Sequence, residues 1–219
     1  MASTIQLSQF KTWVRTKLGD SSFDDASLTQ FANETNREIC NQPVPWPFME
    51  KSFIGTITTG INTYAFPTDM QAPINAEITV PIAQARFLDF MPYKEFDQRY
   101  PDPAALTVST PDIWTRFGGT WIIGPAAPDQ TYTIQMRYIK VPTTTTSDAS
   151  TLDIPDEFSE LLTLGMYARA LEASDEIDYA KDQYQKFAAQ LSLMKQRLAI
   201  QQSGTVQVMQ TRRTLRRGR

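Results

Sequence analysis

Three groups of neighbouring carboxylates are the residues of this sequence best suited to acid-base chemistry. They are Asp24-Asp25, Asp156-Glu157 and the trio Asp175, Glu176 and Asp178. Two carboxylates at a suitable separation can hydrolyse glycosides. Each group also stands where a helix is predicted to begin, a position at which carboxylates satisfy backbone N–H groups and the helix dipole. We therefore interpret the groups as helix caps and keep a carboxylate-based glycosidase as an alternative.

Histidine is absent from all 219 residues, and Cys40 is the only cysteine. These counts exclude Ser-His-Asp and Cys-His nucleophiles, His metal ligands, an internal disulfide and multi-cysteine zinc sites. With no histidine base available, we interpret Cys40 as a small buried residue. The nine glycines form neither of the two glycine-rich phosphate loops. We expect no catalytic residues, no metal and no cofactor.

A cluster of arginines at the C-terminus is the other chemical feature. Five of the 21 basic residues fall in the last eight positions: Arg212, Arg213, Arg216, Arg217 and Arg219. The net charge is −3, so the five positive charges of residues 205–219 leave −8 on residues 1–204. Arginine binds carboxylates and phosphates bidentately, which makes an acidic protein surface and a nucleic-acid backbone the two candidate partners. An acidic body opposes DNA binding, so we favour protein docking.

Helices are predicted at both ends of the chain to position these features. Apolar residues recur at helical spacing over 4–18 and again from Asp24 to about Gln42. A third helix is predicted from Pro155 to about Ser174. A fourth carries apolar residues at alternating intervals of three and four from Ile177 to Leu198. We interpret this last stripe as packing within the same chain rather than as a site for a partner helix.

Strands are predicted between Lys51 and Lys140, where the apolar period changes. Residues 51–58 and 61–66 are expected to pair as a hairpin across Thr59-Gly60. Residues 112–117 and 120–123 are expected to pair across Gly118-Gly119.

Residues 131–140 alternate as a half-buried strand. Residues 93–100 could form one or two helical turns before the prolines that follow. Four aromatic residues in this region are interpreted as core residues rather than as a base-stacking or sugar-binding platform. They are Trp114, Trp121, Tyr132 and Tyr138.

We therefore predict an α+β fold: a small helical bundle with an inserted antiparallel β subdomain and a flexible basic C-terminal arm. The expected segments are N-terminal helices over 1–50, the β subdomain over 51–142, a linker over 143–154, C-terminal helices over 155–203 and the Arg-rich arm over 204–219. No apolar stretch reaches the roughly 18 residues of a bilayer span, and the N-terminus lacks secretory features. We expect a soluble protein with no membrane partner.

The order of segments resembles a known family. The resemblance rests on the run GGTWIIGPAAPDQTYTIQMRY from Gly118 to Tyr138, on LDIPDEF from Leu152 to Phe158, and on the helix LLTLGMYARA from Leu161 to Ala170. These segments are similar to the head-to-tail adaptor proteins of tailed bacteriophages. The similarity extends from the N-terminal helices to about Leu198.

The resemblance implies a structural virion protein without enzymatic activity, made in the host cytoplasm and placed in the neck between head and tail. It implies a homo-oligomeric ring of about twelve copies beneath the portal protein, with a tail or nozzle protein at its other end and packaged DNA passing through its channel. The C-terminal arm would reach into the portal, which assigns docking to Arg212, Arg213, Arg216, Arg217 and Arg219. The alternative is a DNA-binding accessory protein whose arginines contact phosphate.

Overall fold

The computed structural model describes residues 4–203, apart from the side chains of Ala104 and 198–203. Within these residues it contains five α-helices and seven β-strands, which confirms the predicted mixture of helix and strand. The chain divides into two compact units. The β unit is Cys40–Thr144, and the helical unit combines the described residues on either side of it, 4–39 and 145–203.

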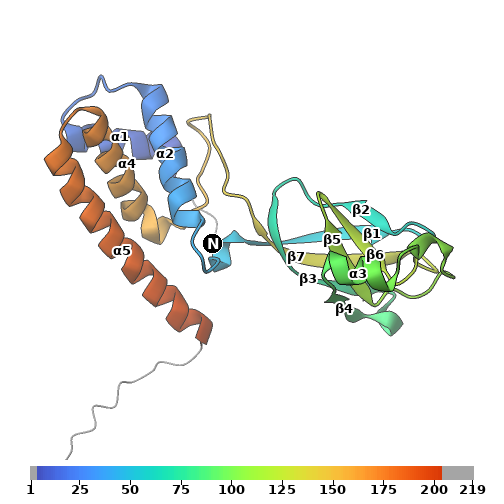
Figure 1. Cartoon of the computed structure of the whole chain (residues 1–219). Helices are drawn as coiled ribbons and strands as arrows, with labels where there is room; N and C mark the ends of the chain where they lie inside the picture. The colour runs from blue at the N-terminus through green and yellow to red at the C-terminus, as the bar shows by residue number, and fades with distance from the viewer. Residues whose placement is uncertain (1–3, 204–219) are drawn as a thin grey trace, which may run out of the picture. The chain divides into compact units, whose positions relative to one another are not determined.

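The helical unit consists of α1 (Leu7–Leu18), α2 (Asp25–Cys40), α4 (Ser159–Ala173) and α5 (Ile177–Ser203) (Figure 1). α4 contacts both α1 and α5, and nine of its fifteen residues are buried. α2 approaches α4 at Gly165, where an added Cβ atom would lie 2.5 Å from Cγ2 of Thr35 and 2.9 Å from Cε2 of Phe187 on α5. α4 is therefore the central helix of this unit.

Local sequence explains where these helices begin and end. α1 opens with a capping box in which the Gln9 side chain accepts the backbone N–H of Gln6, and it ends at Gly19, whose φ of 69° favours glycine. Along α5, the predicted apolar stripe buries Ala180, Phe187 and other members inside the unit. The interpretation of this stripe as core is confirmed for those residues.

The β unit is a seven-stranded sheet in the order β1-β7-β3-β4-β5-β6-β2. The strands are β1 (Glu50–Ile57), β2 (Thr63–Ala65), β3 (Met70–Val80), β4 (Arg86–Phe90), β5 (Ile113–Phe117), β6 (Thr120–Gly124) and β7 (Tyr132–Lys140). The edge strands β1 and β2 are consecutive in the chain and joined by residues 58–62, so the sheet nearly closes on itself (Figure 1). The short helix α3 (Tyr93–Arg99) confirms the helical turns expected over 93–100.

The predicted hairpin of residues 51–58 with residues 61–66 is wrong. β1 pairs with β7, from Glu50 opposite Ile139 to Ile57 opposite Tyr132, whereas β2 pairs with β6. The pairing with β7 gives β1 eight partner residues instead of the three that β2 offers, so it forms more ladder hydrogen bonds and more cross-strand contacts. The expectation of a wholly antiparallel sheet also fails at one place, because β4 and β5 run parallel.

The other strand predictions are confirmed. β5 and β6 pair across Gly118-Gly119, and Gly118 has the positive φ of 59° that this turn requires. β7 alternates as predicted, with its inward side chains buried. The sequence does not predict β3 or β4. The ladder between β3 and β7 shifts register three times, which breaks the regular alternation of β3.

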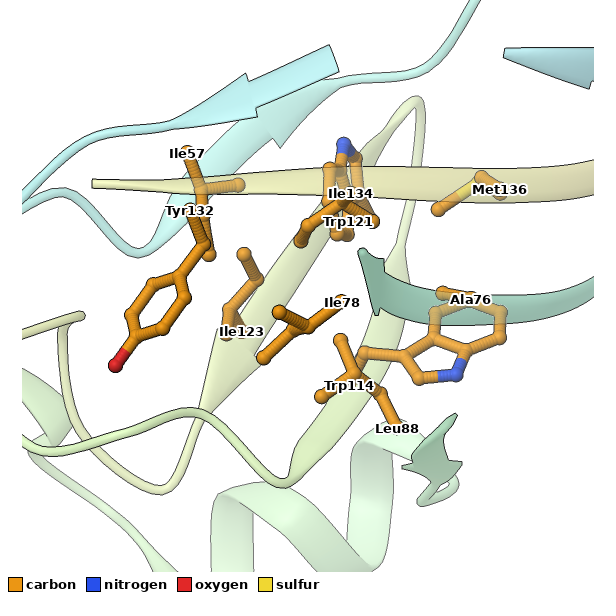
Figure 2. Packing of buried hydrophobic residues seen from close by; sticks show 10 residues of the cluster. All are labelled: Ile57, Ala76, Ile78, Leu88, Trp114, Trp121, Ile123, Tyr132, Ile134 and Met136. Atoms are coloured by element: carbon orange, nitrogen blue, oxygen red, sulfur yellow. The ribbon is translucent and has the colours of Figure 1, made fainter. Parts of the chain in front are cut away.

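A cluster of ten buried residues fills the interior of the sheet, and Figure 2 shows their side chains gathered between the strands. They are Ile57, Ala76, Ile78, Leu88, Trp114, Trp121, Ile123, Tyr132, Ile134 and Met136. Burying a large apolar side chain stabilises a fold by about 1.5–3 kcal/mol. Trp114, Trp121, Tyr132 and Tyr138 are all at most 3% exposed, so the interpretation of these aromatics as core residues is confirmed.

Candidate functional site

The arginines assigned to docking lie outside the described residues. Arg212, Arg213, Arg216, Arg217 and Arg219 follow α5, a helix of 27 residues that ends at Ser203. The expected flexibility of this arm also concerns residues beyond the described part of the chain. The structure therefore identifies the element to which the arm is attached, and the docking role stays a prediction.

The first carboxylate group, Asp24 and Asp25, stabilises the helical unit through hydrogen bonds. Asp24 accepts the backbone N–H of Ser27 at 2.7 Å, which confirms a capping role at the start of α2. This hydrogen bond is the largest cause of the lowered pKa of Asp24. Asp25 instead accepts hydrogen bonds from Lys11 at 2.6 Å and Arg15 at 2.9 Å, and these two bonds lower its pKa.

The second group contacts the start of the chain. The carboxylate of Asp156 accepts the backbone N–H of Thr4 at 3.0 Å and the hydroxyl of Thr4 at 2.5 Å. Asp156 thus joins the segment before α1 to the 3₁₀ turn Asp156–Phe158 that leads into α4. The structure shows a tertiary contact here, and neither the 3₁₀ turn nor α4 begins with a side-chain capping hydrogen bond, so the capping interpretation is not confirmed for this group.

The third group lies at the turn between α4 and α5. Asp175 has a φ of 64°, and Asp175, Glu176 and Asp178 are all exposed.

A glycosidase acid must hold its proton near neutral pH, which requires a raised pKa. The pKa values of Asp24 and Asp25 in the first group are lowered instead, so Asp24 and Asp25 are ionised partners of hydrogen-bond donors.

Each unit has a surface cavity large enough to be tested as a ligand site. A cavity of about 190 Å³ lies between the start of α4 and the end of α5 and presents Glu157, Glu160 and Arg197. A cavity of about 250 Å³ in the β unit presents Asp89, Asp112 and other residues of β4, α3 and β5. Neither cavity is lined by a histidine, cysteine or serine, so a nucleophile of the Ser-His or Cys-His kind is absent from both. Over residues 4–203, no three His, Cys, Asp or Glu side chains are grouped so that they could hold a metal ion.

The exposed apolar side chains of the β unit are a feature that sequence reasoning missed. Ile54, Val80, Ile82 and Phe87 lie on or beside β1, β3 and β4, and Ile82 is 85% exposed. Of these four side chains, only Ile54 could have been recognised as exposed from the sequence. Phe53 and Ile57 point inward, and the alternation of β1 places Ile54 outside. Apolar side chains such as Ile177 and Leu193 are exposed on the helical unit as well, so exposure by itself does not mark an interface. Cys40, by contrast, is buried as predicted.

The polar groups described above stabilise the fold, and several apolar side chains are exposed on the β unit. No helix in the described part of the chain is long and apolar enough to span a membrane. The sequence matches the SU10 adaptor protein family over residues 5–215, and the chain belongs to this family. Membership confirms the resemblance to phage head-tail adaptors and makes the chain a structural component of a phage virion. No curated protein matches the sequence.

Proposed function

We propose that the chain forms a ring that docks beneath the portal of the phage head, receives a tail or nozzle protein and continues the DNA channel. The observation that carries this proposal is the family match, which extends beyond α5 to residue 215. The sequence shared with the family therefore includes Arg212 and Arg213. We propose the five arginines as the docking arm, with twelve copies as the stoichiometry that the family resemblance implies.

The distribution of charge supports separate roles for the body of the chain and for the arm. Residues 1–204 carry −8, and a negative body repels DNA that passes through a channel instead of retaining it. The arm carries +5 and contains no lysine, so each of its cations can form a bidentate pair with a carboxylate.

The test combines the full chain with the portal ring encoded by the same phage and counts copies by native mass spectrometry. We expect a stable complex with one adaptor for each portal subunit. A chain that ends at Ser203 should fold normally, as judged by circular dichroism, but fail to attach. A full chain that binds no portal contradicts the proposed function, whereas full attachment of the shortened chain contradicts only the role of the arm.

The arginine cluster also favours one other candidate, a DNA-binding accessory protein. That function requires tight binding of duplex DNA that weakens steeply as salt rises, because released counterions drive such binding. The adaptor function requires weak DNA binding over the same range of salt. Titration of a labelled duplex at two salt concentrations separates the two.

A further inference from the structure

β1 is a long edge strand with a free side. Its eight residues pair on one side with β7, and among the described residues it has no other neighbouring strand in the sheet. In an antiparallel pair, alternate residues direct their N–H and C=O groups away from the partner. About half of the β1 residues therefore present unpaired donors and acceptors along this edge.

The usual protections of an edge strand are weak in β1. Proteins guard edges with short strands, bulges, prolines or free charges. The opposite edge, β2, has three residues, whereas β1 pairs with β7 in unbroken register and contains no proline. Its lysine, Lys51, is bound to Asp69 at 2.6 Å. The central residue Ile54 is 66% exposed.

Ile54 also belongs to a row of side chains that crosses the outer face of the sheet. The register places Ile54 opposite Gln135, Gln135 opposite Glu77, and Glu77 opposite Phe87. Phe87 is exposed like Ile54, and Glu77 forms a 2.9 Å ion pair with Arg137 on the same face. A strand added at β1 would extend this face and cover the apolar surface of Ile54.

The chain itself contains a segment suited to this edge. Residues 205–211 read Thr-Val-Gln-Val-Met-Gln-Thr, without proline, glycine or charge. Valine and threonine favour strands, and apolar and polar residues alternate from Thr205 to Val208. The segment follows α5 after Gly204 and directly precedes the arginines, and its seven residues are one fewer than the eight of β1.

We propose that residues 205–211 of one copy add as a strand to the free edge of β1 in a neighbouring copy. The proposal rests on the proposed function, because a ring needs one contact that repeats between neighbours. Each copy has one donor segment and one acceptor edge, and such head-to-tail contacts form a ring when the rotation between neighbouring copies closes. Main-chain hydrogen bonds provide the affinity of an added strand, and the residues beyond it, from Arg212 onward, stay available to the portal.

Disulfide trapping between two differently tagged chains tests the proposal. One chain carries Ile54→Cys, and the other carries cysteine at one position from Val206 to Gln210; Cys40 is buried and is retained. Cross-strand neighbours on the same face lie about 4.5–5.5 Å apart between Cβ atoms, whereas the next residue points to the opposite face. We therefore expect the yield of mixed disulfide to alternate along the segment, with every second position at least about five-fold higher.

The trapping is performed both in the adaptor–portal complex and in concentrated free adaptor. Uniformly low yields of mixed disulfide in both samples contradict the proposal. Portal binding is counted separately by native mass spectrometry. A complete portal complex without alternation overturns the strand addition alone, and alternation without portal binding overturns the proposed function alone.

A second variant tests the edge without cysteines. Ile54→Lys places a charge on an exposed position, so the fold should be retained, while an added strand would have to desolvate the lysine ammonium group. We expect about a ten-fold loss of assembled copies at a fixed concentration. Leu193→Lys is the matched control, because Leu193 is 54% exposed on α5 and remote in sequence from β1. Equal losses in both variants contradict a specific role of the edge.

Discussion

Lys11 Nζ in α1 lies 2.5 Å from Oδ1 of Asp148, a residue 137 positions later in the connection that precedes α4. The same ammonium group lies 2.6 Å from Asp25 at the start of α2, and the Lys11 side chain is only 3% exposed. Burial lowers the pKa of Lys11, but the hydrogen bonds to Asp148 and Asp25 outweigh this effect and raise it. One cation therefore joins three segments of the helical unit.

Replacing Lys11 with methionine should destabilise the protein by about 1–3 kcal/mol. The reason is the loss of two hydrogen bonds between charged groups, each worth about 1.5–3 kcal/mol, offset in part by the solvation of two half-exposed carboxylates. Urea unfolding measures the change. Lys195→Met is the control, since Lys195 is exposed and should tolerate the same change within about 0.5 kcal/mol. Equal losses of stability in the two variants would show that the ion pairs of Lys11 with Asp25 and Asp148 do not stabilise the fold.

Asp25→Asn should change how stability depends on pH. The hydrogen bonds from Lys11 and then Arg15 lower the pKa of Asp25 below its usual range, so the unfolded state takes up its proton first on acidification. The stabilisation is therefore complete above about pH 5 and is lost as the pH falls through the folded-state pKa. We expect the variant to be less stable than the wild type at pH 7, with the difference shrinking toward pH 2.5. Urea midpoints across this range measure it, and a constant difference would contradict the pairing.

Gly165→Ala tests how closely α2, α4 and α5 approach. The new methyl group would lie 2.5 Å from Cγ2 of Thr35, so we expect a loss of about 1–3 kcal/mol despite the better helix propensity of alanine. Gly119→Ala is the control, because a Cβ atom there has no neighbour within 4 Å.

Adding Thr35→Ser to Gly165→Ala removes the clashing methyl group and keeps the hydroxyl that Arg169 contacts at 3.0 Å. This second change should restore about half of the lost stability, as measured by thermal or urea unfolding. If the Gly165 variant is as stable as the wild type, the three helices are not packed as closely as the structure indicates.

Replacing all five arm arginines with lysine separates charge from geometry. The net charge of the arm stays +5, so weak attraction to duplex DNA at low salt should change by less than about two-fold. Portal occupancy should fall at least about ten-fold, because lysine cannot form the bidentate pairs of arginine. Native mass spectrometry of the portal complex measures occupancy. Unchanged occupancy would show that the arm acts through charge alone.

Much of the local structure could be predicted from the sequence, because neighbouring residues encode it. The Gly118-Gly119 turn, the alternation of β7 and the stripe of α5 follow from short-range spacing. The density of arginines after α5 is visible in the same way. Belonging to an adaptor family was predicted from runs of residue types, such as the one from Gly118 to Tyr138.

The pairing of the strands and the burial of individual side chains depended on the tertiary structure. Ile57 pairs with Tyr132 rather than with the adjacent strand, and the pairing of β1 with β7 leaves the other side of β1 free as an edge. The side chain of Lys11 is buried, although lysine side chains are usually exposed to solvent. Hydrophobic spacing and charge density are properties of neighbouring residues, so the sequence alone determined the helices, the second hairpin and the basic arm. Strand pairing and burial depend on contacts between residues far apart in the chain, which only the packed structure decided.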